Sequence, residues 1–227
     1  FPLNRTMTTE LLHFADMHYN VVAAQMSRGK TERAAAMAIG AIASTLGHLA
    51  MDVCMWMCQN FGFVKFPDEF TTGSSIMPHK KNPDVFEIMR GKCNRLQSVQ
   101  NEIALLTANL PLGYNRDLQL LKDIIFPATT EMVQCLDMAS FMLEHIQVNT
   151  DILSDPRYDY LFTVEDVNRL ALGGMPFRDA YKTVGMQVQR GEYRPTKSVH
   201  HTHEGSIGNL CNDRIAAKMR RILDKFA

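Results

Sequence analysis

Hydrophobic positions recur at three- and four-residue spacing along most of the chain, with glycine and proline gathered between the apolar segments. This is the period of an amphipathic α-helix, whereas β-strands alternate every second residue. The pattern predicts an all-α protein. The expected long helices cover about residues 8–26, 31–60, 82–109 and 118–145, and shorter ones cover 164–172, 176–190 and 209–226.

The second expected helix is nearly free of polar side chains between residues 34 and 47. A membrane span needs about 20 predominantly apolar residues. His48 and Asp52 interrupt the segment before that length is reached. Its alanine and methionine content is typical of an inner helix that is contacted on several faces. The segment is therefore predicted to be a core helix of a bundle rather than a membrane span.

The residue pattern changes after Asn149, where a turn-rich stretch replaces the long segments of helical apolar spacing. Two short expected helices follow, joined by the glycine and proline of "GGMP", which are typical of a helix end and of the next helix start. The sequence predicts a central helical bundle domain over 1–152 and a small helical C-terminal domain over 153–227.

Composition narrows the possible partners and compartments. The chain has 227 residues, and its 24 basic and 24 acidic side chains cancel, so neither nucleic acid nor a membrane surface is expected as a partner. Five cysteines without a CxxC spacing predict buried thiols in a reducing, cytoplasmic environment rather than disulfides or metal ligands. The chain begins at Phe1 in mid-pattern with no signal segment, and we interpret this start as a cut.

One long loop carries most of the candidate chemistry. The stretch "TTGSSIMPHKKNPD", residues 71–84, lies just before an expected helix, whose N-terminus is the positive end of its dipole. Lys80 and Lys81 add positive charge, and Ser74 and Ser75 add hydroxyls. From these residues alone, an anion-binding site and an ordinary solvated surface loop are about equally good interpretations.

The same stretch resembles a family signature. "GSSIMPHKKNPD" matches every fixed position of G-S-S-x-M-P-x-K-x-N, the signature of the fumarase and aspartase superfamily. "GYNRDLQLLKD" and "GGMPFRDAYKTVG" resemble two segments of the argininosuccinate lyase branch, with Tyr181 where that branch usually has histidine. The resemblance covers essentially the whole chain.

The resemblance implies an elongated helical bundle that assembles as a homotetramer, with each active site drawn from three chains. It implies cleavage of argininosuccinate into arginine and fumarate, without a metal ion or an organic cofactor. Adenylosuccinate lyase is the nearest rival among enzymes, and "YNRDLQ" argues against it. A non-catalytic helical scaffold is the rival from another class.

By the same resemblance, Ser74 is the base that takes the substrate proton, Lys80 stabilises the developing negative charge, and Glu87 orients a catalytic histidine. The residues expected to contact the substrate are Ser75, Asn82, Tyr114, Gln119 and Lys122. The histidine that serves as general acid belongs to an N-terminal segment of the family that this sequence lacks. The "HTH" at 201–203 is followed by Glu204, and a surface or capping role is preferred there to metal binding.

Overall fold

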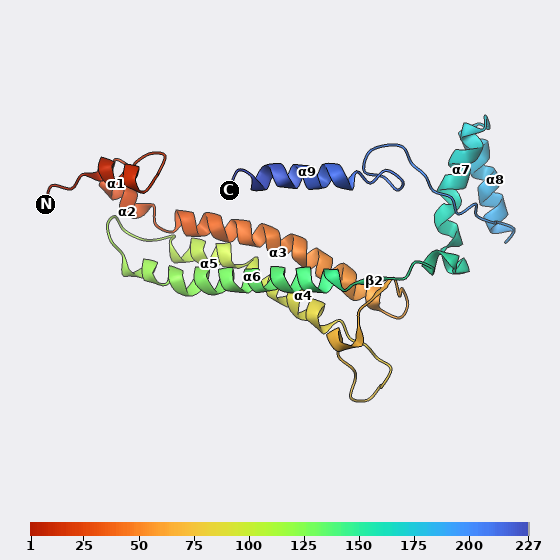
Figure 1. Ribbon diagram of the computed structural model, residues 1–227, viewed down its shortest axis with the longest axis horizontal. Helices are drawn as coiled ribbons and strands as arrows, with labels where there is room; N and C mark the ends of the chain where they lie inside the picture. The colour runs from red at the N-terminus through yellow and green to blue at the C-terminus, as the bar shows by residue number, and fades with distance from the viewer. Residues whose placement is uncertain (227) are drawn as a thin grey trace. The chain divides into compact units, whose positions relative to one another are not determined.

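The computed structural model describes residues 1–226 and divides into two compact units (Figure 1). The first unit runs from Phe1 to Asn149, and the second begins at Thr150. This division lies three residues before the domain boundary expected from the sequence. Helices dominate both units, which confirms the all-α prediction.

The prediction of one helix over residues 8–26 is wrong. The chain forms two short helices there, α1 (Arg5–Leu11) and α2 (Val21–Met26). Each has its own asparagine cap: the side chain of Asn4 accepts a hydrogen bond from the third residue of α1, and Asn20 caps α2 in the same way. A side-chain oxygen at this position satisfies N–H groups that the helix leaves unpaired, so each asparagine starts a new helix.

The long helices of the first unit are α3 (Lys30–Met57), α4 (Asp84–Leu96), α5 (Val99–Leu106) and α6 (Leu121–Glu144). The segment expected to be one helix from 82 to 109 is two, because it is interrupted at Gln97 and Ser98. Pro127 is the seventh residue of α6, and the helix continues through it.

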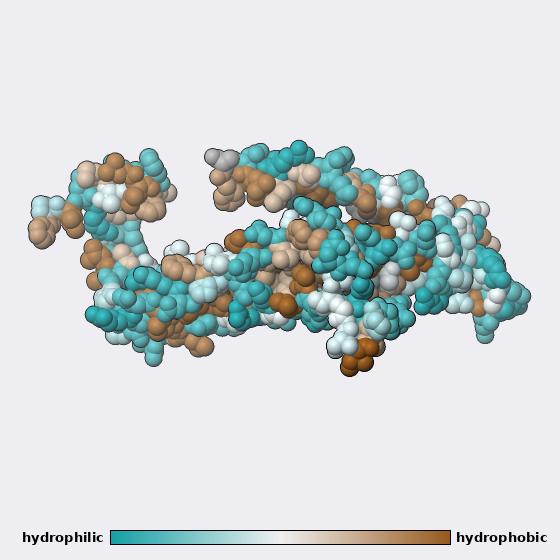
Figure 2. All heavy atoms as spheres, turned by 60° about the horizontal axis from the view of Figure 1, so that its bottom comes forward, coloured by the Kyte–Doolittle hydropathy of each residue, from teal (hydrophilic) through white to brown (hydrophobic). Residues whose placement is uncertain are grey.

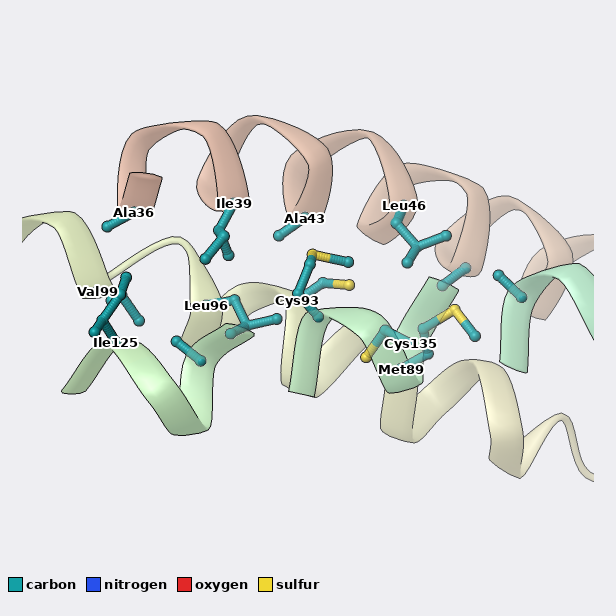
Figure 3. Packing of buried hydrophobic residues seen from close by; sticks show 14 of the residues in the cluster. Ala36, Ile39, Ala43, Leu46, Met89, Cys93, Leu96, Val99, Ile125 and Cys135 are labelled. Atoms are coloured by element: carbon teal, nitrogen blue, oxygen red, sulfur yellow. The ribbon is translucent and has the colours of Figure 1, made fainter. Parts of the chain in front are cut away.

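The core of this unit is a seam between helices (Figure 3). Buried positions of α3 and α6 alternate at spacings of three and four, the pattern that keeps one stripe of a helix facing its partners. Small residues such as Ala43 and Gly47 face Cys93 of α4, where an added Cβ on Gly47 would lie 3.5 Å from the Cys93 Cβ. The close approach of α3 and α4 therefore depends on small side chains.

Helix α3 belongs to this core, as the sequence indicated. The apolar stretch that contains it, 21–57, is long and apolar enough to cross a membrane by length and composition alone. A third of the most apolar window is buried against other helices. The core helix of a soluble protein meets the same criterion, so we assign α3 to the bundle.

Two short strands pair at one end of the bundle, where α3 and α6 end. Strand β1 (Val64–Lys65) pairs antiparallel with β2 (Gln147–Val148), in the register Val64 with Val148. A 3₁₀ turn, η1 (Asp68–Phe70), follows β1 and leads into the loop of residues 71–83. The pairing ties the entry of this loop to the end of α6.

The second unit begins with the 3₁₀ turns η3 (Ile152–Ser154) and η4 (Pro156–Phe162). The helices α7 (Thr163–Leu172), α8 (Phe177–Gln189) and α9 (Asn212–Leu223) follow. Its small apolar core consists of Val167, Ala180, Val184 and Tyr193.

Beside this core lies a buried carboxylate. Asp166 of α7 is 4 % exposed and accepts hydrogen bonds of 2.7 Å from the hydroxyls of Tyr193 and Thr196. Arg169 Nη2 lies 3.0 Å from the same side chain. Burial alone raises the pKa of Asp166, but these hydrogen bonds outweigh it and leave the pKa below its usual value.

Candidate active site

The signature loop, residues 71–83, is closed at its base by backbone pairing. The N–H of Asn82 donates to the carbonyl of Thr72 at 2.9 Å, and the two residues form an isolated antiparallel bridge. The Asn82 side-chain amide donates to the Gly73 carbonyl at 3.3 Å. Helix α4 begins at Asp84 with Pro83 as its cap, so Asn82 closes the loop instead of capping the helix.

Ser74 occupies the turn at the start of this loop. Its Oγ accepts hydrogen bonds from the backbone N–H groups of Ile76 at 3.2 Å and Met77 at 3.1 Å. Its side chain is half-buried, whereas Ser75 is exposed. Two N–H donors aimed at one hydroxyl oxygen stabilise that oxygen when it carries negative charge. Of the two predicted serines, Ser74 therefore has the surroundings that suit a base.

The two lysines of the loop have different partners. Lys81 Nζ lies 2.9 Å from Asp68 Oδ2, an ion pair between the exit of the loop and the η1 turn before it. Lys80 is exposed, and its Nζ makes no ion pair or hydrogen bond with any residue in 1–226. Lys80 is thus the cation of this loop that is open to an anion.

Glu87 lies exposed in the first turn of α4, together with Asp84. These carboxylates already complement the positive end of the helix dipole. An anion at this loop would therefore meet Lys80 and the backbone N–H groups of the loop, rather than the helix end itself.

The tip of the loop is apolar. Ile76 is 86 % exposed and Met77 is 43 % exposed, and Figure 2 shows brown at this projection. Two exposed apolar side chains therefore stand at the tip of an otherwise polar loop. The loop thus presents one apolar end and one cationic side.

The second predicted segment is organised around a 3₁₀ turn, η2 (Arg116–Gln119). Within it, Gln119 Nε2 donates to the hydroxyl of Tyr114 at 2.7 Å, so these two predicted contact residues lie together. Lys122 follows in the first turn of α6 and is exposed. The pair Gln119 and Lys122 spans the junction of the 3₁₀ turn and the helix, and is not part of one continuous α-helix.

These two segments lie at opposite ends of the first unit (Figure 1). The entry of the signature loop meets the end of α6, because the rings of Phe70 and Phe141 are 5.0 Å apart. Tyr114 and Gln119 precede the start of α6. The 24 residues of α6 separate these points by about 36 Å at 1.5 Å per residue. One copy of the chain therefore does not bring Ser74 and Tyr114 into a single site.

The histidines of "HTH" have partners within the second unit. His201 Nε2 lies 3.1 Å from both carboxylate oxygens of Glu165, and the rings of His201 and His203 stack with centroids 5.6 Å apart. Within residues 1–226, no group of three or more histidine, cysteine, aspartate or glutamate side chains is placed to hold a metal ion.

The cysteines are free thiols, but they are not uniformly buried as expected. Cys93 and Cys135 lie in the core, whereas Cys58 is exposed because it follows the last residue of α3. Burial, together with the neighbouring Cys135, raises the pKa of Cys93 to about 11.

Comparison with known proteins places these features in context. The profile of a lyase family matches residues 9–98. The chain is 59 % identical over 226 residues to an argininosuccinate lyase of Phocaeicola vulgatus, covering all of this chain and 51 % of that protein. An argininosuccinate lyase of Stenotrophomonas maltophilia is 36 % identical over 96 % of the chain. The chain spans about half the length of the curated relatives it matches.

Solved structures share the fold at low sequence identity. An EDDS lyase with bound fumarate superposes with a TM-score of 0.66 over 84 % of this chain, at 19 % identity. The 3-carboxy-cis,cis-muconate lactonizing enzyme of Pseudomonas putida gives 0.64 over 81 %, at 18 % identity.

The helical bundle with its signature loop is that of the fumarase and aspartase superfamily of lyases. Over its whole length the chain is similar to argininosuccinate lyases, at 58–59 % identity.

Proposed function

We propose that the protein of which this chain forms part cleaves argininosuccinate into arginine and fumarate. The observation that carries the proposal is the environment of Ser74, whose Oγ accepts two backbone N–H hydrogen bonds in a loop that also holds the unpaired Lys80. The relatives named argininosuccinate lyase, at 58–59 % identity, support the choice of substrate.

The chemistry requires a base for a weakly acidic proton. The proton leaves the carbon next to a carboxylate, and the C–N bond on the neighbouring carbon then breaks. The bonding electrons of the C–H bond become the double bond of fumarate, and those of the C–N bond leave with the arginine nitrogen. In this scheme Ser74 takes the proton as an alkoxide, which the N–H groups of Ile76 and Met77 stabilise.

The intermediate of this elimination is a carbanion whose charge spreads into the adjacent carboxylate, so a fixed cation lowers its energy. Lys80 supplies that cation from the same loop. The departing nitrogen needs a proton from a general acid, which we expect from a histidine of the part of the relatives that this chain does not span. Glu87 would orient that histidine, and Ser75 and Asn82 would complete the carboxylate site.

We further propose that the site is shared between copies of the chain in a homotetramer. The separation of about 36 Å between the Ser74 loop and the Tyr114 segment supports this, since both carry predicted substrate contacts. The outer faces of the long helices supply apolar surface for association. Their exposed large side chains include Met37, Ile42 and Met51 on α3 and Phe126, Val133 and Leu136 on α6.

The free cysteines favour a reducing compartment, and we propose the cytoplasm. Neither a metal ion nor an organic cofactor enters the proposed mechanism, because the serine base and the lysine cation supply its charges.

The test joins this chain to the first half of the Phocaeicola vulgatus relative and measures fumarate release from argininosuccinate. The joined protein should be active and the chain alone inactive. Ser74→Ala should abolish release while the oligomer keeps its mass, and Ser75→Ala, the matched control, should fall far less. Near-normal activity of Ser74→Ala would remove the assigned base. Activity with adenylosuccinate instead would overturn the substrate.

A further inference from the structure

The ion pair between Asp68 and Lys81 bridges the two ends of the signature loop. Asp68 begins the η1 turn just before the loop, and Lys81 lies at its exit, with Nζ and Oδ2 2.9 Å apart. The Thr72–Asn82 bridge lies next to this ion pair along the chain, since Asn82 directly follows Lys81. Together they form a double closure, one backbone pair and one charge pair, around the segment that carries Ser74 and Lys80.

The ion pair also distinguishes two neighbouring cations. Lys80 and Lys81 are adjacent in the chain, about 3.8 Å apart at Cα. No acidic side chain lies within residues 71–83 to balance them. Asp68 neutralises Lys81 and turns it back toward η1, which leaves Lys80 as the cation that is free for a ligand.

We infer that Asp68 is a positioning residue for the proposed lyase reaction. It pairs with Lys81, holds the ends of the loop together and leaves Lys80 as the cation that binds the substrate carboxylate. We call the Asp68–Lys81 ion pair the clasp. Lys81 is then part of the clasp and does not touch the substrate. This inference rests on the proposed function for its effect on turnover, but the clasp itself exists without substrate.

The expected effect is modest because both partners are exposed, with side chains 46 % and 79 % accessible. Exposed ion pairs of this kind change an equilibrium by up to about fivefold and weaken with added salt. Loss of a cation that binds the substrate itself would be far larger, since a buried charge partner in the closed site would be left unpaired.

The first experiment follows hydrogen exchange of the amides of residues 71–83 in this chain without substrate. Asp68→Asn and Lys81→Met should each speed exchange about two- to fivefold at low salt, and the double variant should be no faster than either single one. Asp68→Glu should retain protection. Glu69→Gln, an exposed neighbour in η1, is the matched control and should leave exchange unchanged. Equal protection in Asp68→Asn and the native chain would overturn the clasp.

The second experiment measures kcat/KM of the joined protein. Asp68→Asn and Lys81→Met should lower it by the same factor of about two to five, whereas Lys80→Met should lower it at least a hundredfold. A Lys81→Met loss as large as that of Lys80→Met would place Lys81 on the substrate and overturn the inference. If the native joined protein releases no fumarate, the proposed function fails, while the exchange result still decides the clasp.

Discussion

Removing the buried carboxylate of Asp166 should unfold the second unit. Asp166→Ala deletes the acceptor of two 2.7 Å hydrogen bonds, from Tyr193 and Thr196. Hydrogen bonds to a charged group contribute about 1.5–3 kcal/mol each. The Arg169 contact adds at most about 1 kcal/mol, because its side chain is 60 % exposed. The substitution also leaves the Tyr193 hydroxyl buried without this acceptor.

The sum is a loss of about 3–7 kcal/mol, which is a large part of the stability of a small domain. The apolar core of this unit is small, and the Asp166 network adds the link between α7 and the segment of Tyr193 and Thr196 that follows α8. The assay is urea unfolding of the full chain, combined with hydrogen exchange in the peptides of α7 and α8. Exchange there should rise to the level of the unfolded state, while α3 and α6 keep their protection.

Glu165→Ala is the matched control. It removes the neighbouring carboxylate, whose pair with His201 is partly exposed, and should cost less than about 1 kcal/mol. If Asp166→Ala stays within 1 kcal/mol of the native chain, the network does not hold the unit, and the reasoning from hydrogen-bond geometry is wrong.

Three further predictions follow from the packing and the titrating groups. The pKa of Asp166 is lower in the folded state than in the unfolded one. The stability that its carboxylate contributes is therefore complete at neutral pH and is lost as the pH falls from about 4 through the folded-state pKa. Acid titration of Asp166→Asn should lack this loss. Gly29→Ala should destabilise the chain by about 1–3 kcal/mol in thermal unfolding, because Gly29 has φ +90° and an added Cβ would lie 2.7 Å from Thr107 Cγ2. Iodoacetamide at neutral pH should alkylate exposed Cys58 well before Cys93, whose pKa is about 11, as peptide mass spectrometry would show.

The sequence predicted the helices well where the apolar residues keep one helical spacing throughout. The spacing of apolar residues predicted α3, α6, α7 and α8 to within a few residues, because each buries one continuous stripe. It failed at 8–26, where Asn20 starts a second helix inside an otherwise helical pattern. Cap residues act through one or two hydrogen bonds, so they weigh little in a hydrophobic pattern.

The residues of the candidate site could be predicted from the sequence, but their arrangement in space could not. The signature identified Ser74 and Lys80, while nothing local indicated that Asp68 pairs with Lys81 or that Thr72 pairs with Asn82. Those contacts join residues across a loop, and their register depends on how the chain turns. The distance between Ser74 and Tyr114 likewise follows from helix length and direction, which only the fold provides.

The most direct test of the shared site is to mix two inactive variants of the joined protein. One carries Ser74→Ala, and the other carries Gln119→Ala with Lys122→Met, so each lacks a different end of the proposed site. After unfolding and refolding together, mixed oligomers should combine an intact loop from one copy with an intact Tyr114 segment from another and recover fumarate release. If the mixture stays as inactive as each variant alone while mixed oligomers form, the site is not shared between copies.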